Sequence, residues 1–344
     1  MKTVTISVSK TYPIHIGYGL LHKIGQYAVS LDKANKVCIV SDSNVWPLYG
    51  NIVKESLVSA GFQICEFVFP AGEESKNGLV YLELLNFLAQ QKLTRTDLIA
   101  ALGGGVVGDL AGFAAATYLR GIRFLQIPTT LLAAVDSSVG GKTAIDLPAG
   151  KNLAGAFCQP SIVLCDLDTL DTLPTDIFRD GCAEVIKYAV LYDPDLFSLL
   201  EKDSFSFDRE TVIARCVTWK RDVVMQDEYD TGLRMKLNLG HTIGHGIEAA
   251  SRFTISHGKA VAIGTAIVSR AFSCQDTARI ESLLCKFGLP VSAEYGAEEL
   301  LCHILSDKKR SADTISLIVP RTIGNCEILT LPVSQLDTIL QAGL

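Results

Sequence analysis

The feature that most restricts the fold of this chain is a strand, a glycine loop and a helix in direct succession. Residues 98–102 are apolar and predict a buried strand, and the small apolar residues 110–118 predict a helix. Between them stand Gly103, Gly104, Gly105 and, after two valines, Gly108 and Asp109. Glycine lets a backbone approach an anion, and a helix start offers unpaired N–H groups, so the pattern indicates a phosphate-binding loop. A glycine-rich turn that binds nothing is the alternative interpretation.

Strands and helices alternate around this loop. The expected strands are residues 36–40, 63–69, 98–102, 124–127 and 161–165, and the expected helices are residues 19–28, 48–60, 78–90 and 110–118. Residues 3–8 and 12–16 predict an N-terminal hairpin. The alternation predicts a doubly wound α/β domain, which binds ligands at the carboxyl ends of its parallel strands.

Polar side chains follow several of these strands. Asp42 and Asn44 come after the strand 36–40, and Glu73 and Lys76 lie in the loop after the strand 63–69. An acid in such a position can bind ribose hydroxyls, although Asp and Asn also cap helices. In the usual dinucleotide-binding order the glycine loop comes before the acid, and here it comes after, so this is not the ordinary dehydrogenase arrangement.

The pattern becomes helical beyond Pro174, which marks the expected boundary between domains 1–173 and 174–344. Helices are expected at residues 178–191, 195–200, 209–226, 233–250, 258–272 and 277–287. Strand character returns at residues 314–319 and 326–329, and a last helix is expected from Ser334. A length of 344 residues suits two domains of ordinary size.

Composition excludes several classes of function. A net charge of -6 argues against a nucleic-acid surface. The apolar runs are short and interrupted by glycine, so we expect no membrane span, and the N-terminus has no signal-peptide core. The 10 cysteines form no C-x-x-C pair, which favours reduced thiols in a cytoplasmic protein.

The helical half contains a concentration of metal-binding residue types. His241 and His245 stand one helical turn apart, Glu248 follows, and His257 comes soon after. Two histidines, a carboxylate and an open position suit catalytic Zn²⁺ and other divalent ions. Spacing alone favours the pair His241 and His245 as ligands. Upstream, Glu184 stands three residues before a lysine among apolar neighbours, which suggests a buried ion pair.

Cations accompany the histidines. They are Lys220, Arg234, Lys236, Lys259 and the run DKKR at 307–310. A solvated helix face is one interpretation. The other is a site for an anionic substrate with phosphate and carboxylate groups. Arginine binds such groups with two parallel hydrogen bonds, and lysine binds them with a single positive charge.

At this point the chain resembles the 3-dehydroquinate synthase family of sugar-phosphate cyclases over nearly its whole length. The resemblance is carried by the segments PAGEESK, ALGGGVVGDLAGFAAATYLRGIRF, IPTTLLAAVDSSVGGKTAID, GKNLAGAF, GCAEVIKYA, GLRMKLNLGHTIGHGIE and HGKAVAIG. It implies a Rossmann-like NAD domain, a helical metal domain, an active site between the two, and a homodimer. Two departures are Asp230, where the family usually has Glu, and Asn77, where it usually has Ser or Thr.

The resemblance also implies a set of site residues. The implied metal ligands, for Zn²⁺ or Co²⁺, are Glu184, His241 and His257, so that His245 faces the substrate instead. The implied catalytic residues are Asp136, Lys142, Lys187, Lys220 and His245. The implied substrate-binding residues are Asn152, Arg234, Asn238, Lys308 and, across the dimer, Arg120. The implied NAD-binding residues are Asp42, Asn44, Glu73, Lys76, Gly105, Val106, Val107, Gly108, Asp109, Thr129, Thr130, Lys142, Lys151, Thr169, Leu170, Asp171 and Thr172.

The implied reaction converts 3-deoxy-D-arabino-heptulosonate 7-phosphate (DAHP) to 3-dehydroquinate and phosphate. It proceeds by transient oxidation with NAD, β-elimination of phosphate, re-reduction, ring opening and an intramolecular aldol step. Three alternatives are a metal-dependent polyol dehydrogenase, a cyclase for another sugar phosphate, and an NAD-binding sensor without activity. The segments VDSSVGGKTA and GKN argue against the dehydrogenase. Arg234 and Lys220, as possible partners of a substrate carboxylate, argue against a cyclase for another sugar phosphate. The intact set of candidate metal ligands argues against the inactive sensor.

Overall fold

The computed structural model describes residues 1–31, 33–307 and 313–344. The chain divides into two compact units. Unit 1 comprises residues 1–174 and 220–229, and unit 2 comprises residues 175–219 and 230–344. The expected division at 173/174 stays a prediction. None of the helices described is long and apolar enough to cross a membrane.

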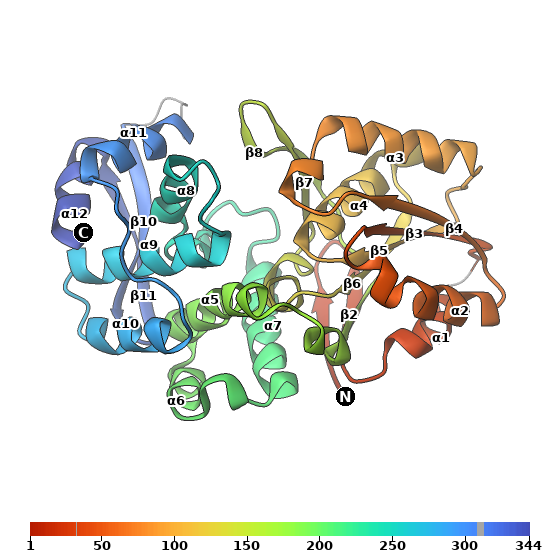
Figure 1. Ribbon diagram of the computed structural model, residues 1–344, viewed down its shortest axis with the longest axis horizontal. Helices are drawn as coiled ribbons and strands as arrows, with labels where there is room; N and C mark the ends of the chain where they lie inside the picture. Colours follow the sequence, from red (N-terminus) through yellow and green to blue (C-terminus); the bar gives the residue numbers. More distant parts are fainter. Residues whose placement is uncertain (32, 308–312) are drawn as a thin grey trace. The chain divides into compact units, whose positions relative to one another are not determined.

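Unit 1 is built on a seven-stranded sheet with the order β1-β2-β9-β6-β5-β3-β4 (Figure 1). Its strands are β1 Lys2–Ser7, β2 Thr11–Gly17, β3 Lys36–Asp42, β4 Gln63–Phe69, β5 Leu98–Gly103, β6 Arg123–Pro128 and β9 Ile162–Asp166. The strands β1 and β2 form the expected antiparallel hairpin, and every other pair in the sheet is parallel. A second, two-stranded sheet joins β7 Lys142–Leu147 to β8 Gly150–Phe157.

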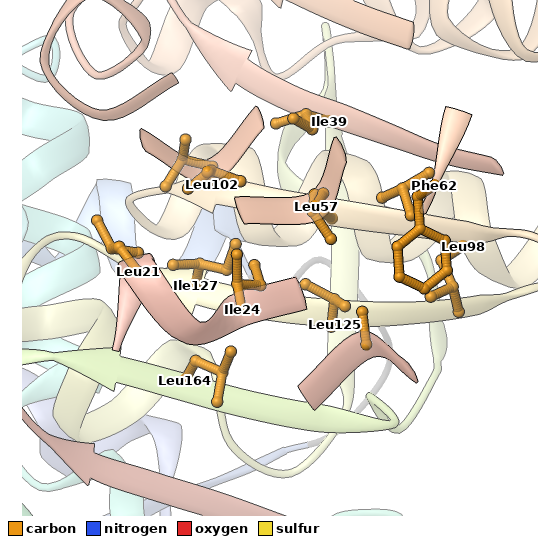
Figure 2. Packing of buried hydrophobic residues seen from close by; sticks show 14 of the residues in the cluster. Leu21, Ile24, Ile39, Leu57, Phe62, Leu98, Leu102, Leu125, Ile127 and Leu164 are labelled. Carbon is orange, nitrogen blue, oxygen red and sulfur yellow. The ribbon is translucent and has the colours of Figure 1, made fainter. Parts of the chain in front are cut away.

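Helices cover both faces of the large sheet, which confirms the doubly wound α/β architecture. The helices are α1 Ile24–Val29, α2 Asn51–Ser59, α3 Gly78–Gln90 and α4 Gly105–Thr117. Alternate residues along β5 enter opposite cores: Leu98 and Leu102 pack with α1 and α2 (Figure 2), while Ile99 packs with α3 and α4. Because successive strand side chains point to opposite faces, an unbroken apolar strand such as β5 is buried on both.

Unit 2 is helical around one antiparallel hairpin. Its helices are α5 Thr175–Tyr192, α6 Pro194–Asp203, α7 Arg209–Gln226, α8 His241–Ala250, α9 His257–Ala271, α10 Thr277–Lys286, α11 Ala297–Asp307 and α12 Leu336–Gly343. The hairpin joins β10 Thr314–Thr322 to β11 Asn325–Pro332. The helix α7 begins in unit 2, and its last residues, from Lys220, group with unit 1. Ile247 of α8, Ile263 of α9 and Ile304 of α11 share one core with the hairpin.

Two expected helix boundaries were wrong. The helix expected at 110–118 begins at Gly105, because Gly104 takes an extended N-cap conformation and the next residues already have helical dihedral angles. The single helix expected at 233–250 is a 3₁₀ helix, Leu233–Asn238, followed by α8. Gly240 separates them with a left-handed φ of 76°, which ends a right-handed helix. The helix α11 and the pair β7–β8 were not anticipated.

Candidate active site

The glycine loop of unit 1 lies at the carboxyl edge of the parallel sheet. Gly103 ends β5 and is paired in register with Pro128, the last residue of β6. The backbone N–H of Thr129 donates to the Gly103 carbonyl at 3.0 Å, so the residues that follow β6 lie beside the glycine loop. The first turn of α4 begins there, with the unpaired N–H groups of a helix start. This edge is therefore suited to a phosphate group.

The residues after β3 lie at the same edge. Ser41 pairs in register with Leu102, so Asp42 stands next to Gly103. One carboxylate oxygen of Asp42 accepts hydrogen bonds from the backbone N–H groups of Asn44 and Val45, both at 2.9 Å. These contacts form an Asx turn and not a helix cap, because the helix that follows, Trp46–Gly50, has Val45 as its N-cap and no side-chain cap. Asn44 is exposed beside it.

A buried lysine links three of the expected site residues in unit 1. The Lys76 ammonium lies 2.6 Å from an Asp109 carboxylate oxygen and 2.6 Å from the side-chain oxygen of Asn152. Burial opposes the charge of Lys76, but Asp109 and Glu73 raise its pKa above the ordinary value. Glu73 lies 3.9 Å from both Lys76 and Lys151. The structure therefore brings the PAGEESK loop, the start of α4 and the β8 strand together.

The segment after β9 is hydrogen-bonded to Tyr49, in the short helix Trp46–Gly50 that precedes α2. The Tyr49 hydroxyl lies 2.5 Å from the Thr172 hydroxyl and 3.3 Å from the Thr169 carbonyl oxygen. Thr169 and Leu170 are buried, and Asp171 and Thr172 are exposed. These contacts hold the segment in place, and they leave two of its four residues at the surface.

A second cluster of unit 1 holds substrate residues of the resemblance. The Lys220 ammonium donates to the Asp136 carboxylate and, at 2.5 Å, to the Asp136 carbonyl oxygen. Lys220 is 5% exposed, and it comes from the end of α7, far from Asp136 in sequence. Lys142 begins β7 and is exposed. Arg120 is also exposed, with a left-handed φ of 64°.

Three helices of unit 2 bring a carboxylate and two imidazoles together. Glu184 comes from the middle of α5, His241 is the first residue of α8, and His257 is the first residue of α9. The Glu184 Oε1 atom lies 3.2 Å from His257 Nε2 and 3.5 Å from His241 Nε2. Four tetrahedral ligands at about 2.0–2.1 Å from Zn²⁺ lie roughly 3.3–3.4 Å apart. Both distances to Glu184 Oε1 are close to this separation, and the three ligand atoms lie within 4.8 Å of one another, so the group fits one small divalent ion.

The two histidines differ in charge state. Burial lowers the pKa of His241 to about 3, so its imidazole is neutral. Its Nδ1 atom lies 3.0 Å from the Leu239 carbonyl oxygen, which turns Nε2 toward Glu184. Burial opposes the charge of His257 as well, but hydrogen bonds to Glu184 and Glu248 raise its pKa to about 10. An arriving cation therefore takes the place of a proton on His257.

The pair favoured by spacing alone, His241 and His245, is only part of the arrangement. His245 lies on the exposed side of α8, with its ring centroid 5.7 Å from that of His241 and 6.1 Å from that of His257. A second group of possible ligand atoms consists of His245, Glu248 and His257. His257 belongs to both groups.

The other expected site residues of unit 2 lie near Glu184 or His241 along the chain. The Lys187 ammonium lies 2.5 Å from Glu184 Oε2, and both side chains are at most 2% exposed, so the ion pair is buried as expected. Arg234 is buried and Asn238 is exposed, both in the 3₁₀ helix before α8. Asp230 has a left-handed φ of 59°. Lys308 and Lys309 lie outside the described residues.

Sequence reasoning missed Asp180, one turn before Glu184 on α5. Its carboxylate accepts hydrogen bonds from the Ser256 hydroxyl, at 2.5 Å, and from the backbone N–H of Lys259, at 3.1 Å. Asp180 therefore caps α9 from a different helix and holds the turn that begins with His257. The only signal for it in the sequence is the Asp–Glu spacing of four, which puts both side chains on one face of α5.

Comparisons with known proteins agree along the whole chain. A family model described as 3-dehydroquinate synthase N-terminal matches residues 66–180, and one described as 3-dehydroquinate synthase C-terminal matches residues 181–310. The 3-dehydroquinate synthase of Pelobacter propionicus is 46% identical, over 98% of this chain and 99% of that protein. The 3-dehydroquinate synthase of Enterococcus faecalis is 42% identical, over 99% of this chain and 98% of that protein.

Solved structures show the same fold. A 2-deoxy-scyllo-inosose synthase complexed with carbaglucose-6-phosphate, NAD⁺ and Co²⁺ is 26% identical, with a TM-score of 0.90 over 100% of both chains. A glycerol dehydrogenase of Schizosaccharomyces pombe is 18% identical, with a TM-score of 0.67 over 96% of this chain and 88% of that one, and it shares the fold alone.

Proposed function

The chain belongs to the 3-dehydroquinate synthase family, and we propose that Glu184, His241 and His257 hold the one divalent metal ion of this enzyme. The enzyme is a lyase of the shikimate pathway that converts DAHP to 3-dehydroquinate and phosphate, with NAD and a divalent metal as cofactors. The observation that carries the metal assignment is the convergence of three ligand atoms from three helices at 3.2 and 3.5 Å.

The metal, when bound, acts as a Lewis acid on a substrate hydroxyl and lowers its pKa. The protein residues around it fix the charge of the centre. Glu184 supplies one negative charge, and the neutral His241 supplies an imidazole without one. Lys187 holds the second carboxylate oxygen of Glu184, so this oxygen is oriented by an ion pair. His245, exposed beside the two ligand histidines, binds the substrate and exchanges protons with it.

NAD, when bound, accepts a hydride from the substrate and returns it within one turnover. The first turn of α4 would hold the pyrophosphate of NAD, through the residues Gly105, Val106, Val107, Gly108 and Asp109. The charged side chains beside the pyrophosphate are Glu73, Lys76 and Lys151. A ribose is bound by Asp42 and Asn44. Thr129, Thr130 and the segment of Thr169, Leu170, Asp171 and Thr172 complete the NAD site. The alignment of the ends of β3, β5 and β6 supports this assignment.

The phosphorylated substrate is bound in unit 1 by residues around one ion pair. Asp136 holds the Lys220 ammonium, and this pair orients the substrate together with Lys142 and Asn152. Arg234, Asn238 and Lys308 add charge and hydrogen-bond donors for its carboxylate and phosphate. Cationic donors placed before the substrate arrives stabilise a leaving phosphate without reorganisation.

The enzyme is a homodimer in which Arg120 reaches the neighbouring subunit's substrate. Leu119 and Arg120 both have left-handed dihedral angles, with φ of 53° and 64°, and both are exposed. Two successive non-glycine residues in this conformation cost of order 1–3 kcal/mol each, which is typical of functional segments. Leu79 and Leu82, exposed on α3, offer apolar surface for the second subunit. The protein functions in the cytoplasm, in keeping with ten free cysteines.

The function is tested by incubating metal-loaded protein with DAHP and a catalytic amount of NAD⁺. We expect one phosphate and one 3-dehydroquinate per DAHP, with no net accumulation of NADH. The His257→Ala variant is expected to lose this activity, and the metal-stripped wild-type protein is expected to recover it when Zn²⁺ or Co²⁺ is restored. Net NADH equal to the substrate consumed would instead identify a dehydrogenase. Full activity without metal would overturn the ligand assignment.

A further inference from the structure

His257 has a different carboxylate on each ring nitrogen. Its Nε2 atom lies 3.2 Å from Glu184 Oε1, and its Nδ1 atom lies 3.3 Å from Glu248 Oε2. A carboxylate only accepts hydrogen bonds, so the proton of the Nδ1–Glu248 bond belongs to the imidazole. The Nε2 atom faces a carboxylate in the same way, so a cation that binds there replaces the Nε2 hydrogen, while Glu248 keeps the other hydrogen on Nδ1.

Glu248 is held for this contact by α8. It stands two turns after His241 on the same helix, and its side chain is 4% exposed. The neighbouring Ile247 is in the core of unit 2, so the backbone at Glu248 is fixed by packing. A buried carboxylate needs hydrogen-bond donors to offset its lost hydration, and the imidazole of His257 is one of them.

We propose that Glu248 is a positioning residue of the metal centre, which holds the His257 ring through Nδ1 and aims its Nε2 atom at the ion. The inference rests on the proposed ligand set. It adds that the two histidine ligands differ in the partner of their Nδ1 atoms. The Nδ1 atom of His241 faces a neutral carbonyl oxygen, whereas the Nδ1 atom of His257 faces a carboxylate. A carboxylate partner makes an imidazole the stronger donor to a metal.

The rival arrangement is a second cation held by His245, Glu248 and His257, whose possible ligand atoms also lie within 4.8 Å of one another. It needs the Nδ1 atom of His257, which faces Glu248, to lose its hydrogen. A hydrogen bond satisfies Glu248 and His257 as they stand, and it leaves His245 available to the substrate. Metal stoichiometry separates the two arrangements.

The test uses the full chain stripped of metal and titrated with Co²⁺, whose visible absorption reports on ligand geometry. The variants are Glu248→Gln, which keeps the shape and loses the charge, and Glu248→Ala, which removes the acceptor. We expect one Co²⁺ per chain, bound about 10-fold more weakly by the first variant and about 100-fold more weakly by the second, with a shifted spectrum. Glu281→Gln is the matched control, since its carboxylate also pairs with a side chain of α9, which is Arg270 and not a histidine. It is expected to keep the affinity and spectrum of the wild type.

His257→Ala separates failure of the inference from failure of the ligand set. If His257→Ala binds Co²⁺ like the wild type, the proposed ligands are wrong. If it loses Co²⁺ while Glu248→Gln keeps both the affinity and the spectrum of the wild type, the role of Glu248 is wrong. Two Co²⁺ ions per wild-type chain, falling to one in Glu248→Gln, would assign Glu248 to a second cation site instead. NAD⁺ affinity, measured on every variant, checks that unit 1 remains folded.

Discussion

The ammonium of Lys76 lies 2.6 Å from the side-chain oxygen of Asn152, so a residue of the proposed NAD site holds a residue of the proposed substrate site. Asn152 has a left-handed φ of 57°, and its backbone N–H donates to an Asp146 carboxylate oxygen at 2.8 Å. The Asn152 side-chain oxygen is occupied by Lys76, which leaves its two N–H donors for the substrate. The two sites of unit 1 are therefore joined by one buried cation.

We expect Lys76→Met to weaken the binding of both NAD⁺ and DAHP. A hydrogen bond to a charged group contributes about 1.5–3 kcal/mol, so each affinity falls by roughly 10- to 100-fold. Calorimetric titration with NAD⁺ and the KM for DAHP at saturating NAD⁺ provide the two measurements. Lys54→Met, which removes a half-exposed ion pair with Glu66, is the control and is expected to change neither. An effect confined to NAD⁺ would contradict the link to Asn152.

Lys187→Met is expected to destabilise the metal-free protein and to slow turnover while NAD⁺ binding is retained. Removing one partner of a buried ion pair costs about 3–5 kcal/mol, because the other charge is left buried. A bound cation supplies a replacement charge at Glu184, so Zn²⁺ should stabilise this variant more than the wild type. Denaturant unfolding with and without Zn²⁺ measures both effects. An equal gain from Zn²⁺ in the two proteins would show that the ion does not bind beside Glu184.

The stability of unit 1 is expected to depend on pH through Asp97. Its carboxylate accepts hydrogen bonds from the backbone N–H groups of Lys36 and Thr94, at 2.9 and 2.7 Å, and from the Thr94 hydroxyl at 2.8 Å. Burial opposes its charge, but these hydrogen bonds lower its pKa below the ordinary value. The stabilisation is therefore complete above the pKa of the unfolded chain, about 3.9, and is lost as the pH falls through the lower pKa of the folded state.

Asp97→Asn is expected to lower the free energy of unfolding by about 1–3 kcal/mol at pH 7. The difference from the wild type should shrink as the pH falls from about 4, where the carboxyl of the unfolded wild type is protonated, through the lower pKa of the folded state, where the native carboxyl is protonated as well. Urea unfolding at several pH values measures it. Glu55→Gln, on the exposed side of α2, serves as the control and should change stability by less than about 0.5 kcal/mol. A difference that stays constant down to pH 2 would mean that the charge of Asp97 is unimportant.

Gly258→Ala is expected to disturb the start of α9 and, through the adjacent His257, the metal site. A β-carbon at this position would lie 2.0 Å from the Asp180 carbonyl oxygen, so α5 and α9 would have to separate. Overpacking of this kind costs about 1–3 kcal/mol, and Co²⁺ affinity should fall with it. Thermal unfolding and Co²⁺ titration test this. Gly296→Ala, where a β-carbon meets open space, should leave both quantities unchanged.

Several features of the fold could be predicted because they depend on neighbours along the chain. The strand β4 and the helices α3 and α7 have the expected bounds, since each has one apolar period and clear end signals. Elements that depend on distant contacts were missed. The start of α4 depends on glycines that let the helix approach Gln126, and the break before α8 depends on the approach of Gly240 to the Val261 carbonyl oxygen.

The sequence by itself determined which residue types were available and in what order: the glycine loop, the acid before it, and the histidines of unit 2. The tertiary structure decided which of them meet. His241 and His245 share a helix face. Only the packing of α9 against both α8 and α5 brings Glu184 and His257 to the first of them. Sequence periodicity reports the face of one helix, whereas a metal site needs atoms from three helices within a few ångströms. That distance is set by how closely small residues such as Gly258 let the helices approach.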